Sequence, residues 1–308
     1  MFGFTEPLAA RGPRSTDPLA SGRWCAIIAP YNRGEKGGTV EQPHYDWFRI
    51  AEVERDLFVI EEPGHVQSYL VRGRARSALI DTGMGFRDIR AALAPLSPGE
   101  TIVLNTHWHF DHTGGNALFA QRGISDLEAQ RVAQDFSPAQ LRELVVKPAQ
   151  AEGLPLPSGF DPEAYAIRGA PPTFTIAHGD QLDLGGRALE AIATPGHTHG
   201  SLSFLDSATG SLLVGDLAYR GAIYAHLDDS DVDEYVATLT MLLGRASEFR
   251  ALFPAHNEYP VAVSFLAALL EGFRRIEGGT AEGQLIEGWG RPVRRFPFEG
   301  FSILLRAE

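Results

Sequence analysis

From Trp47 onward, short apolar runs alternate with longer stretches in which apolar residues recur at helical spacing. Apolar runs of roughly four to eight residues bounded by Gly, Pro or Asp are typical of strands, and longer periodic stretches are typical of helices. The pattern predicts strands at 57–60, 66–71, 78–80, 101–104, 187–192, 203–205, 212–214 and 251–253, and helices at 87–93, 232–243 and 261–276. Strands and helices recur in two similar halves, which predicts an α+β fold of two packed sheets with helices outside.

Two segments depart from this pattern. Residues 1–45 are rich in Gly, Pro, Arg and Ser, which predicts an irregular N-terminal extension in front of one large domain at 46–308. We expect the extension to lie on the domain or on a second copy, so that a homodimer through it is open to test by sizing a chain without residues 1–45. Residues 125–170 are helical in character apart from Pro155 and Pro157, and they predict a helical insertion that could cover a site.

Charge and composition narrow the class of partner. The chain has 308 residues and a net charge of -12, which disfavours nucleic acid and anionic membranes as partners and leaves a small molecule as the expected substrate. Arg291, Arg294 and Arg295 form the densest basic cluster, in what the turn residues around them predict to be a solvated loop. With a single cysteine, no membrane-length apolar run and no secretion signal, a cytoplasmic protein is expected.

Three histidines and an aspartate fall within six residues, in the run His107-Trp108-His109-Phe110-Asp111-His112. The run follows a predicted strand, so His107 and His109 can face one cation while Asp111 and His112 turn toward a second. Nitrogen and carboxylate ligands suit zinc first, with manganese, iron or cobalt as alternatives. The run therefore predicts a metal site with room for two ions.

Other candidate ligands follow predicted strands elsewhere in the chain. His197 comes after the apolar run at 187–192, Asp216 follows 212–214, and His256 follows 251–253. Each of them alone would be an ordinary turn residue, but together with the histidine run they complete a ligand set. Asp81, in Asp81-Thr82-Gly83, is placed to support the histidine loop rather than to bind metal.

These motifs together resemble the metallo-β-lactamase superfamily over about residues 47–270. The matching pieces are 79–83, 107–112, 194–197, 214–216 and 254–256. The resemblance implies a four-layer αββα sandwich with a two-metal site at one edge between the sheets. It implies that one metal is bound by His107, His109 and His197, that the other is bound by Asp111, His112 and His256, and that Asp216 bridges them.

The resemblance also implies a mechanism. Two cations roughly 3.5–4 Å apart lower the pKa of a shared water, and the resulting bridging hydroxide attacks the substrate. Asp111 is expected to hold the proton of the nucleophile and to pass it to the leaving group. Tyr219 lies three residues after Asp216, at the offset where lactonases of the family carry a substrate-contacting tyrosine, and could donate a hydrogen bond to the developing oxyanion.

The expected substrate is an ester-like carbonyl, either a lactone or a thioester. True β-lactamases of this fold generally lack the bridging aspartate, so Asp216 favours the esterase-like branches. Alternatives on the same site are phosphoester or β-lactam hydrolysis. A di-iron redox enzyme is disfavoured because His109 stands where such proteins carry glutamate, and a non-catalytic binding protein is disfavoured by seven intact ligand candidates.

Overall fold

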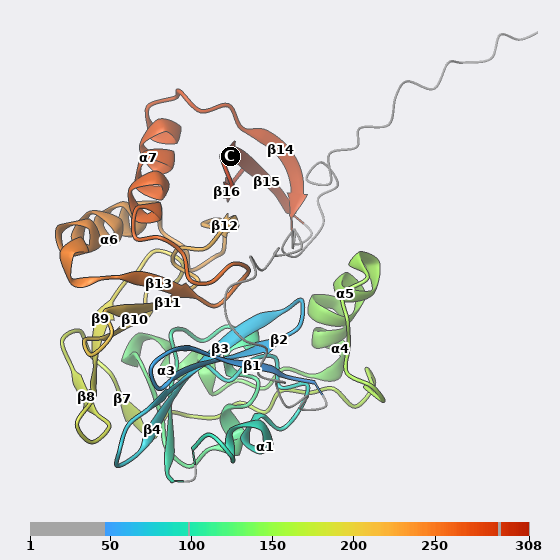
Figure 1. The fold of residues 1–308 in the computed structure, drawn as a ribbon. Helices are drawn as coiled ribbons and strands as arrows, with labels where there is room; N and C mark the ends of the chain where they lie inside the picture. Colours follow the sequence, from blue (N-terminus) through green and yellow to red (C-terminus); the bar gives the residue numbers. More distant parts are fainter. Residues whose placement is uncertain (1–46, 98, 289–290, 308) are drawn as a thin grey trace, which may run out of the picture.

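The computed structural model describes residues 47–97, 99–288 and 291–307, and the predicted extension at 1–45 lies outside the described residues. The first half of the chain forms a seven-stranded sheet in strand order β1 to β7 (Figure 1). Its strands are β1 (Arg49–Glu54), β2 (Leu57–Glu62), β3 (Val66–Arg72), β4 (Ser77–Ile80), β5 (Thr101–Leu104), β6 (Arg122–Ile124) and β7 (Phe174–Thr175).

The second half forms a five-stranded sheet in the order β13-β11-β10-β9-β8, and a four-stranded sheet in the order β12-β16-β15-β14. The five strands are β8 (Gln181–Asp183), β9 (Ala188–Ala193), β10 (Leu202–Asp206), β11 (Ser211–Gly215) and β13 (Ala251–Pro254). The four strands are β12 (Gly221–Tyr224), β14 (Gln284–Gly288), β15 (Arg291–Phe298) and β16 (Phe301–Arg306).

Helices and short helical turns complete the fold. The α-helices are α1 (Ile89–Leu93), α2 (Phe110–Thr113), α3 (Ala129–Val132), α4 (Pro138–Leu141), α5 (Lys147–Glu152), α6 (Val232–Gly244) and α7 (Phe265–Glu277). The other turns are η2 (Asn116–Leu118), η3 (Asp126–Glu128), η4 (Arg142–Val146) and η5 (Ala246–Glu248). None of the helices in the described ranges has the length and apolarity needed to cross a membrane.

Both main sheets are apolar on both faces, and this explains the continuous apolar strands. In β2, Leu57 and Val59 face the layer between the sheets, whereas Phe58 and Ile60 face α1 and the insertion. In the second sheet, Leu213 of β11 faces the inter-sheet layer. The adjacent Leu212 and Val214 face α6 and α7.

Helices cover the outer face of each sheet, so the order of layers is helix, sheet, sheet, helix. Helix α1 and the helical residues at 138–152 pack against the first sheet, and α6 and α7 pack against the second (Figure 1). The prediction of an α+β fold with a four-layer αββα sandwich is confirmed. The small third sheet was not predicted; it packs on α7 through Phe301 and Ile303 of β16.

Strand directions bring the two halves together at one edge. Strands β4 and β5 are parallel, and β9, β11 and β13 also share one direction. Backbone hydrogen bonds then join the two sheets at this edge, from Leu202 N in β10 to Thr106 O after β5 and from Gln67 N in β3 to Ala255 O after β13. The loops that carry the candidate ligands therefore emerge next to one another.

The predicted helical insertion at 125–170 is only partly helical. A capping box between Ser137 and Gln140 starts a helical run through α4, η4 and α5, which ends at Gly153 with φ of 68°. The chain from there to residue 170 contains no further helix. Phe136, just before this run, stacks on Trp108 of the histidine run with ring centroids 6.4 Å apart. The insertion thus packs beside the predicted site.

Two local predictions were wrong. Helix α7 begins at Phe265 rather than at residue 261, because Val261 uses its backbone to pair with Leu252 of β13. The arginines at 291–295 lie on strand β15 rather than in a loop, and Arg295 is buried. Antiparallel pairing with β16 satisfies the backbone of that strand and overrides the turn residues around it.

We expect the inter-sheet layer to carry much of the stability. Phe204 of β10 is fully buried there, so Phe204→Ala should lower the free energy of unfolding by about 3–5 kcal/mol, measured by chemical denaturation. Leu285→Ala on β14, where the side chain is 65% exposed, is the control and should change it by less than about 0.5 kcal/mol. Equal effects of the two substitutions would contradict the assignment of this layer as the core.

Candidate metal centre

All of the predicted ligands lie in loops, turns or a short helix that follow strands at the shared edge. Strand β5 leads into the histidine run, whose last residues form the short helix α2 with Asp111 and His112 in it. Asp216 directly follows β11, and His256 comes two residues after β13. His197 follows β9 after a tight turn in which Gly196 has φ of 141°, and a Cβ there would lie 2.6 Å from the ring of Tyr235.

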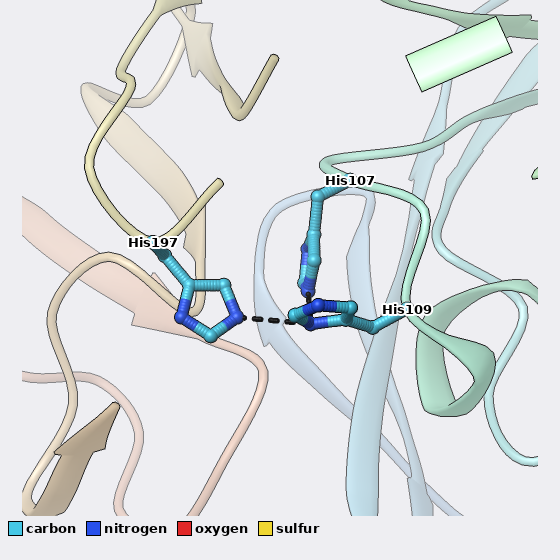
Figure 2. Close-up of side chains that lie close together, drawn as sticks. All are labelled: His107, His109 and His197. Carbon is cyan, nitrogen blue, oxygen red and sulfur yellow. Dashed lines mark hydrogen bonds between the residues drawn. The ribbon is translucent and has the colours of Figure 1, made fainter. Parts of the chain in front are cut away.

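One group of three imidazoles joins the two halves of the chain. Nε2 of His107 lies 2.9 Å from Nδ1 of His109, and Nε2 of His197 lies 3.0 Å from that same nitrogen. Figure 2 shows the three rings turned toward one another, two from the histidine run and one from the opposite loop. Such convergence of nitrogen atoms is the donor set of a transition-metal site.

A second group combines a carboxylate with two imidazoles. Oδ2 of Asp111 lies 3.5 Å from Nε2 of His112 and 3.4 Å from Nε2 of His256. Asp111 and His112 are neighbours in sequence, whereas His256 arrives from the far end of the second sheet. Together they form another donor set that could hold a metal ion.

Asp216 lies between the two groups and presents one oxygen to each. Its Oδ1 is 3.2 Å from Nε2 of His112 and 3.3 Å from Nε2 of His256. Its Oδ2 is 3.6 Å from Nε2 of His197 in the first group. This is the arrangement expected of a carboxylate that bridges two metal ions.

The polar atoms of this centre fit a bound cation better than they fit one another. Nε2 of His112 and Oδ1 of Asp216 are both buried and, within the described residues, neither has a hydrogen-bond partner, although they are only 3.2 Å apart. A buried polar atom without a partner costs roughly 1–3 kcal/mol. A cation bound by both atoms would satisfy them, so the residues present fit a bound metal ion.

In His112, His197 and His256, the ring nitrogen that faces away from the centre lies within hydrogen-bond distance of a protein oxygen. Oδ2 of Asp81 lies 2.9 Å from Nδ1 of His112 and accepts a hydrogen bond from Thr106 Oγ1, while Oδ1 accepts one from Thr106 N. Nδ1 of His197 lies 3.0 Å from the Tyr224 carbonyl, and Nδ1 of His256 lies 2.9 Å from the His65 carbonyl. These contacts orient each ring with Nε2 toward the centre, and they confirm that Asp81 supports the histidine loop.

Burial and charge lower the pKa values of His107 and His109 and raise those of His112 and His256. Burial, together with the neighbouring imidazoles, lowers the pKa of His107 well below its usual value and that of His109 to about 3. Both rings are therefore neutral near pH 7, and the neutral imidazole is the form that binds metal.

The second group has the opposite balance. Burial disfavours the charged form of His112, but the carboxylates of Asp111, Asp216 and Asp81 outweigh it and raise its pKa to about 10. The pKa of His256 is raised well above its usual value by the same balance against Asp216 and Asp111. Protonated His112 and His256 thus neutralise the carboxylates of this group, as a bound cation would.

Tyr219 lies beside the second group. Its ring is 5.5 Å from that of His256, and its hydroxyl donates a 2.5 Å hydrogen bond to the carbonyl of Ala222. The side chain is buried, and burial raises its pKa well above the usual value, so the phenol is neutral. The hydroxyl already has an acceptor inside the protein, which the sequence did not reveal.

Other contacts of the centre also had no signal in the sequence. The carbonyls of His65 and Tyr224 act through the backbone, so their side-chain identity is uninformative. Glu128 reaches the histidine run and the His197 loop across 20 and 70 residues of sequence, and no motif around it indicates either contact. Only Thr106, directly before the run, stood where a supporting role could have been suspected.

Comparison with known proteins agrees with this geometry. The family model of the metallo-beta-lactamase superfamily matches residues 62–256, a span that contains every candidate ligand. The chain belongs to the metallo-beta-lactamase superfamily. The predictions of this family and of a hydrolase are thereby confirmed.

Curated relatives and solved structures are also similar to this chain. Acyl-coenzyme A thioesterase MBLAC2 of Homo sapiens is 27% identical over 216 residues, which cover 64% of this chain and 76% of that protein. A hydroxyacylglutathione hydrolase of Rhodospirillum rubrum is 29% identical over 153 residues, covering 49% of this chain and 47% of that protein. A metallo-beta-lactamase from Pontibacter korlensis superposes with a TM-score of 0.54 at 18% identity, over 74% of this chain and 99% of the other, and so shares the fold.

Replacing Asp81 tests the support behind the second group. We expect Asp81→Asn to weaken divalent-metal binding by about 10–100-fold, because its single amide oxygen can face either Thr106 N, as Oδ1 does, or His112 and Thr106 Oγ1, as Oδ2 does, but not both. The measurement is competition between the metal-loaded chain and a chelator of known affinity. Glu258→Gln, an exposed change of equal charge two residues after His256, is the control and should leave binding unchanged. Unaltered affinity in Asp81→Asn would contradict the supporting role.

Proposed function

We propose that the chain is a dinuclear metal-dependent hydrolase that cleaves a thioester, with a lactone as the second candidate. The observation that carries the proposal is the position of Asp216, with one oxygen facing each group of imidazoles. In this proposal the first ion is held by His107, His109 and His197, and the second by Asp111, His112 and His256. Zinc is the first candidate because the donors are nitrogen and carboxylate oxygen.

Two divalent cations in such a centre supply activation of water near neutral pH and polarisation of a carbonyl oxygen. Asp111 is the residue proposed to hold the proton of the nucleophile. Burial opposes its ionisation, but His112 and His256 outweigh burial and lower its pKa to about 2, so the carboxylate is charged and able to accept. Its side chain is 19% exposed, which leaves it accessible from the substrate side for transfer of that proton to the leaving sulfur or oxygen.

The surroundings of the first group favour an acyl substrate. Trp108 lies against His109 with ring centroids 4.7 Å apart, and Phe136 stacks on Trp108. Phe110 contacts Phe136 in turn, and all three aromatic rings are only partly buried. An apolar wall of this kind beside a hydrolytic centre suits the hydrocarbon part of an acyl group. The names of the relatives, a thioesterase and an acylglutathione hydrolase, support the thioester.

The metal and substrate assignments can be tested together. We expect elemental analysis of the purified chain to find about two divalent ions, and we expect kcat/KM to be highest on thioesters in a panel with lactones, aryl esters, phosphodiesters and β-lactams. His109→Ala should abolish turnover because it removes the nitrogen on which the first group converges. His178→Ala, at an exposed histidine, is the control. A chain without metal, or a preference for phosphodiesters or β-lactams, would overturn the proposal.

Tyr219 is proposed to donate a hydrogen bond to the developing oxyanion, which requires its hydroxyl to exchange Ala222 O for the substrate. We then expect Tyr219→Phe to lower kcat on the best substrate by about a hundredfold with little change in KM. Whether or not Tyr219 has a catalytic role, loss of its hydrogen bond to Ala222 should lower the free energy of unfolding by about 1 kcal/mol, measured by denaturation. If stability falls but kcat is unchanged, Tyr219 is a packing residue and has no catalytic role.

A further inference from the structure

A buried carboxylate outside the ligand set joins the two loops that form the first group. Glu128, at the end of η3, is 3% exposed. Its Oε1 accepts hydrogen bonds from Thr198 Oγ1 at 2.8 Å and from Gly200 N at 2.9 Å. Its Oε2 accepts one from Trp108 N at 3.1 Å.

The positions of these donors are informative. Trp108 stands between His107 and His109, and Thr198 directly follows His197. One side chain therefore fastens the loop from the first half of the chain to the loop from the second half. These two loops carry the three imidazoles of the first group, in which His107 and His197 converge on Nδ1 of His109.

The contacts of Glu128 are specific to a carboxylate. All three donors are neutral, and within the described ranges no Lys or Arg forms a salt bridge to it, so the hydrogen bonds alone offset the cost of burying the acid. Gly200 makes the approach possible, since a Cβ there would lie 2.5 Å from Cγ and Oε1 of Glu128. A larger residue at position 200 would displace the Glu128 side chain from this position.

We propose that Glu128 is a positioning residue that sets the separation of His107 and His109 from His197, and thereby controls metal affinity at the first group alone. The inference rests on the proposed two-metal function. The second group is supported by other contacts, from Asp81 to His112 and from the His65 carbonyl to His256, and none of them involves Glu128. Loss of Glu128 should therefore separate the affinities of the two ions.

The substitution Glu128→Gln keeps the size of the side chain and removes one acceptor. The amide NH2 must then face either Trp108 N or Gly200 N. Both of these are donors, so the hydrogen bond to one of the two loops is lost. Asp126→Asn is the matched control, because Asp126 is exposed on the same turn. Thr198→Val leaves the Glu128 carboxylate intact and removes only the contacts of the Thr198 hydroxyl, with Glu128 Oε1 and with Ser201 Oγ. It provides a milder variant if Glu128→Gln does not fold.

The metal-loaded full chain would be equilibrated with chelators of graded strength while zinc content and the imidazole NMR signals of histidine-labelled protein are followed. We expect one of the two zinc ions in Glu128→Gln to be lost to a chelator whose zinc affinity is about 10–100-fold lower than the parent chain requires. The signals of His107, His109 and His197 should change first. Thr198→Val should show a smaller change in the same direction, and Asp126→Asn none.

Other outcomes separate the two proposals. If the parent chain holds two zinc ions and Glu128→Gln loses both together, or neither, then Glu128 does not position the first group and the inference is overturned. Loss of the ion held by His112 and His256 before the other would overturn it as well. A parent chain that binds neither zinc nor manganese, iron or cobalt overturns the proposed function itself, independently of any variant.

Discussion

Face-to-face packing of the two sheets is the constraint on which the centre depends. The inter-sheet layer aligns β4 and β5 of one sheet with β9, β11 and β13 of the other, so that their ligand-bearing ends share one edge. No ligand group is complete within either half of the chain. The first group takes His197 from the second half, and the second group takes His256. Packing of apolar side chains thus determines the geometry of the polar centre.

Contacts of the imidazole Nδ1 atoms with oxygens outside the centre explain how so many polar groups can be buried there. His112, His197 and His256 each direct Nδ1 to a fixed oxygen, and two of these oxygens are backbone carbonyls that cannot move without the fold. Among the candidate ligands in the described residues, the buried atoms without a hydrogen-bond partner are Nε2 of His112 and Oδ1 of Asp216, which meet at the inner face. The pattern of satisfied and unsatisfied atoms therefore outlines the position of the cations.

The two groups differ in what holds them. Asp81 supports the second group from within the first half of the chain, through Thr106 and His112. Glu128 supports the first group across the two halves, through Trp108 and Thr198. The second group is also joined across the halves, by the contact of the His65 carbonyl with Nδ1 of His256, but that link is made by the backbone rather than by a buried carboxylate.

Sequence alone determined the ligand types and the fold class. The run from His107 to His112 is informative because its spacing is local, and a strand followed by a turn places these side chains whatever the rest of the chain does. His197, Asp216 and His256 were found for a related reason, since each directly follows an apolar strand and strand ends are readable from apolar periodicity. The start of α7 and the strand β15 were misread, because pairing of Val261 with Leu252 and of β15 with β16 overrides local preference.

Tertiary structure alone decided which side chains meet. The hydroxyl of Tyr219 points to Ala222, and Glu128 reaches Trp108 and Thr198, although nothing near these residues in sequence signals either contact. The physical reason is that a hydrogen bond depends on distance and direction in space, which apolar periodicity does not encode. The sequence therefore specified the chemistry of the centre, and the packing of the two sheets specified its geometry.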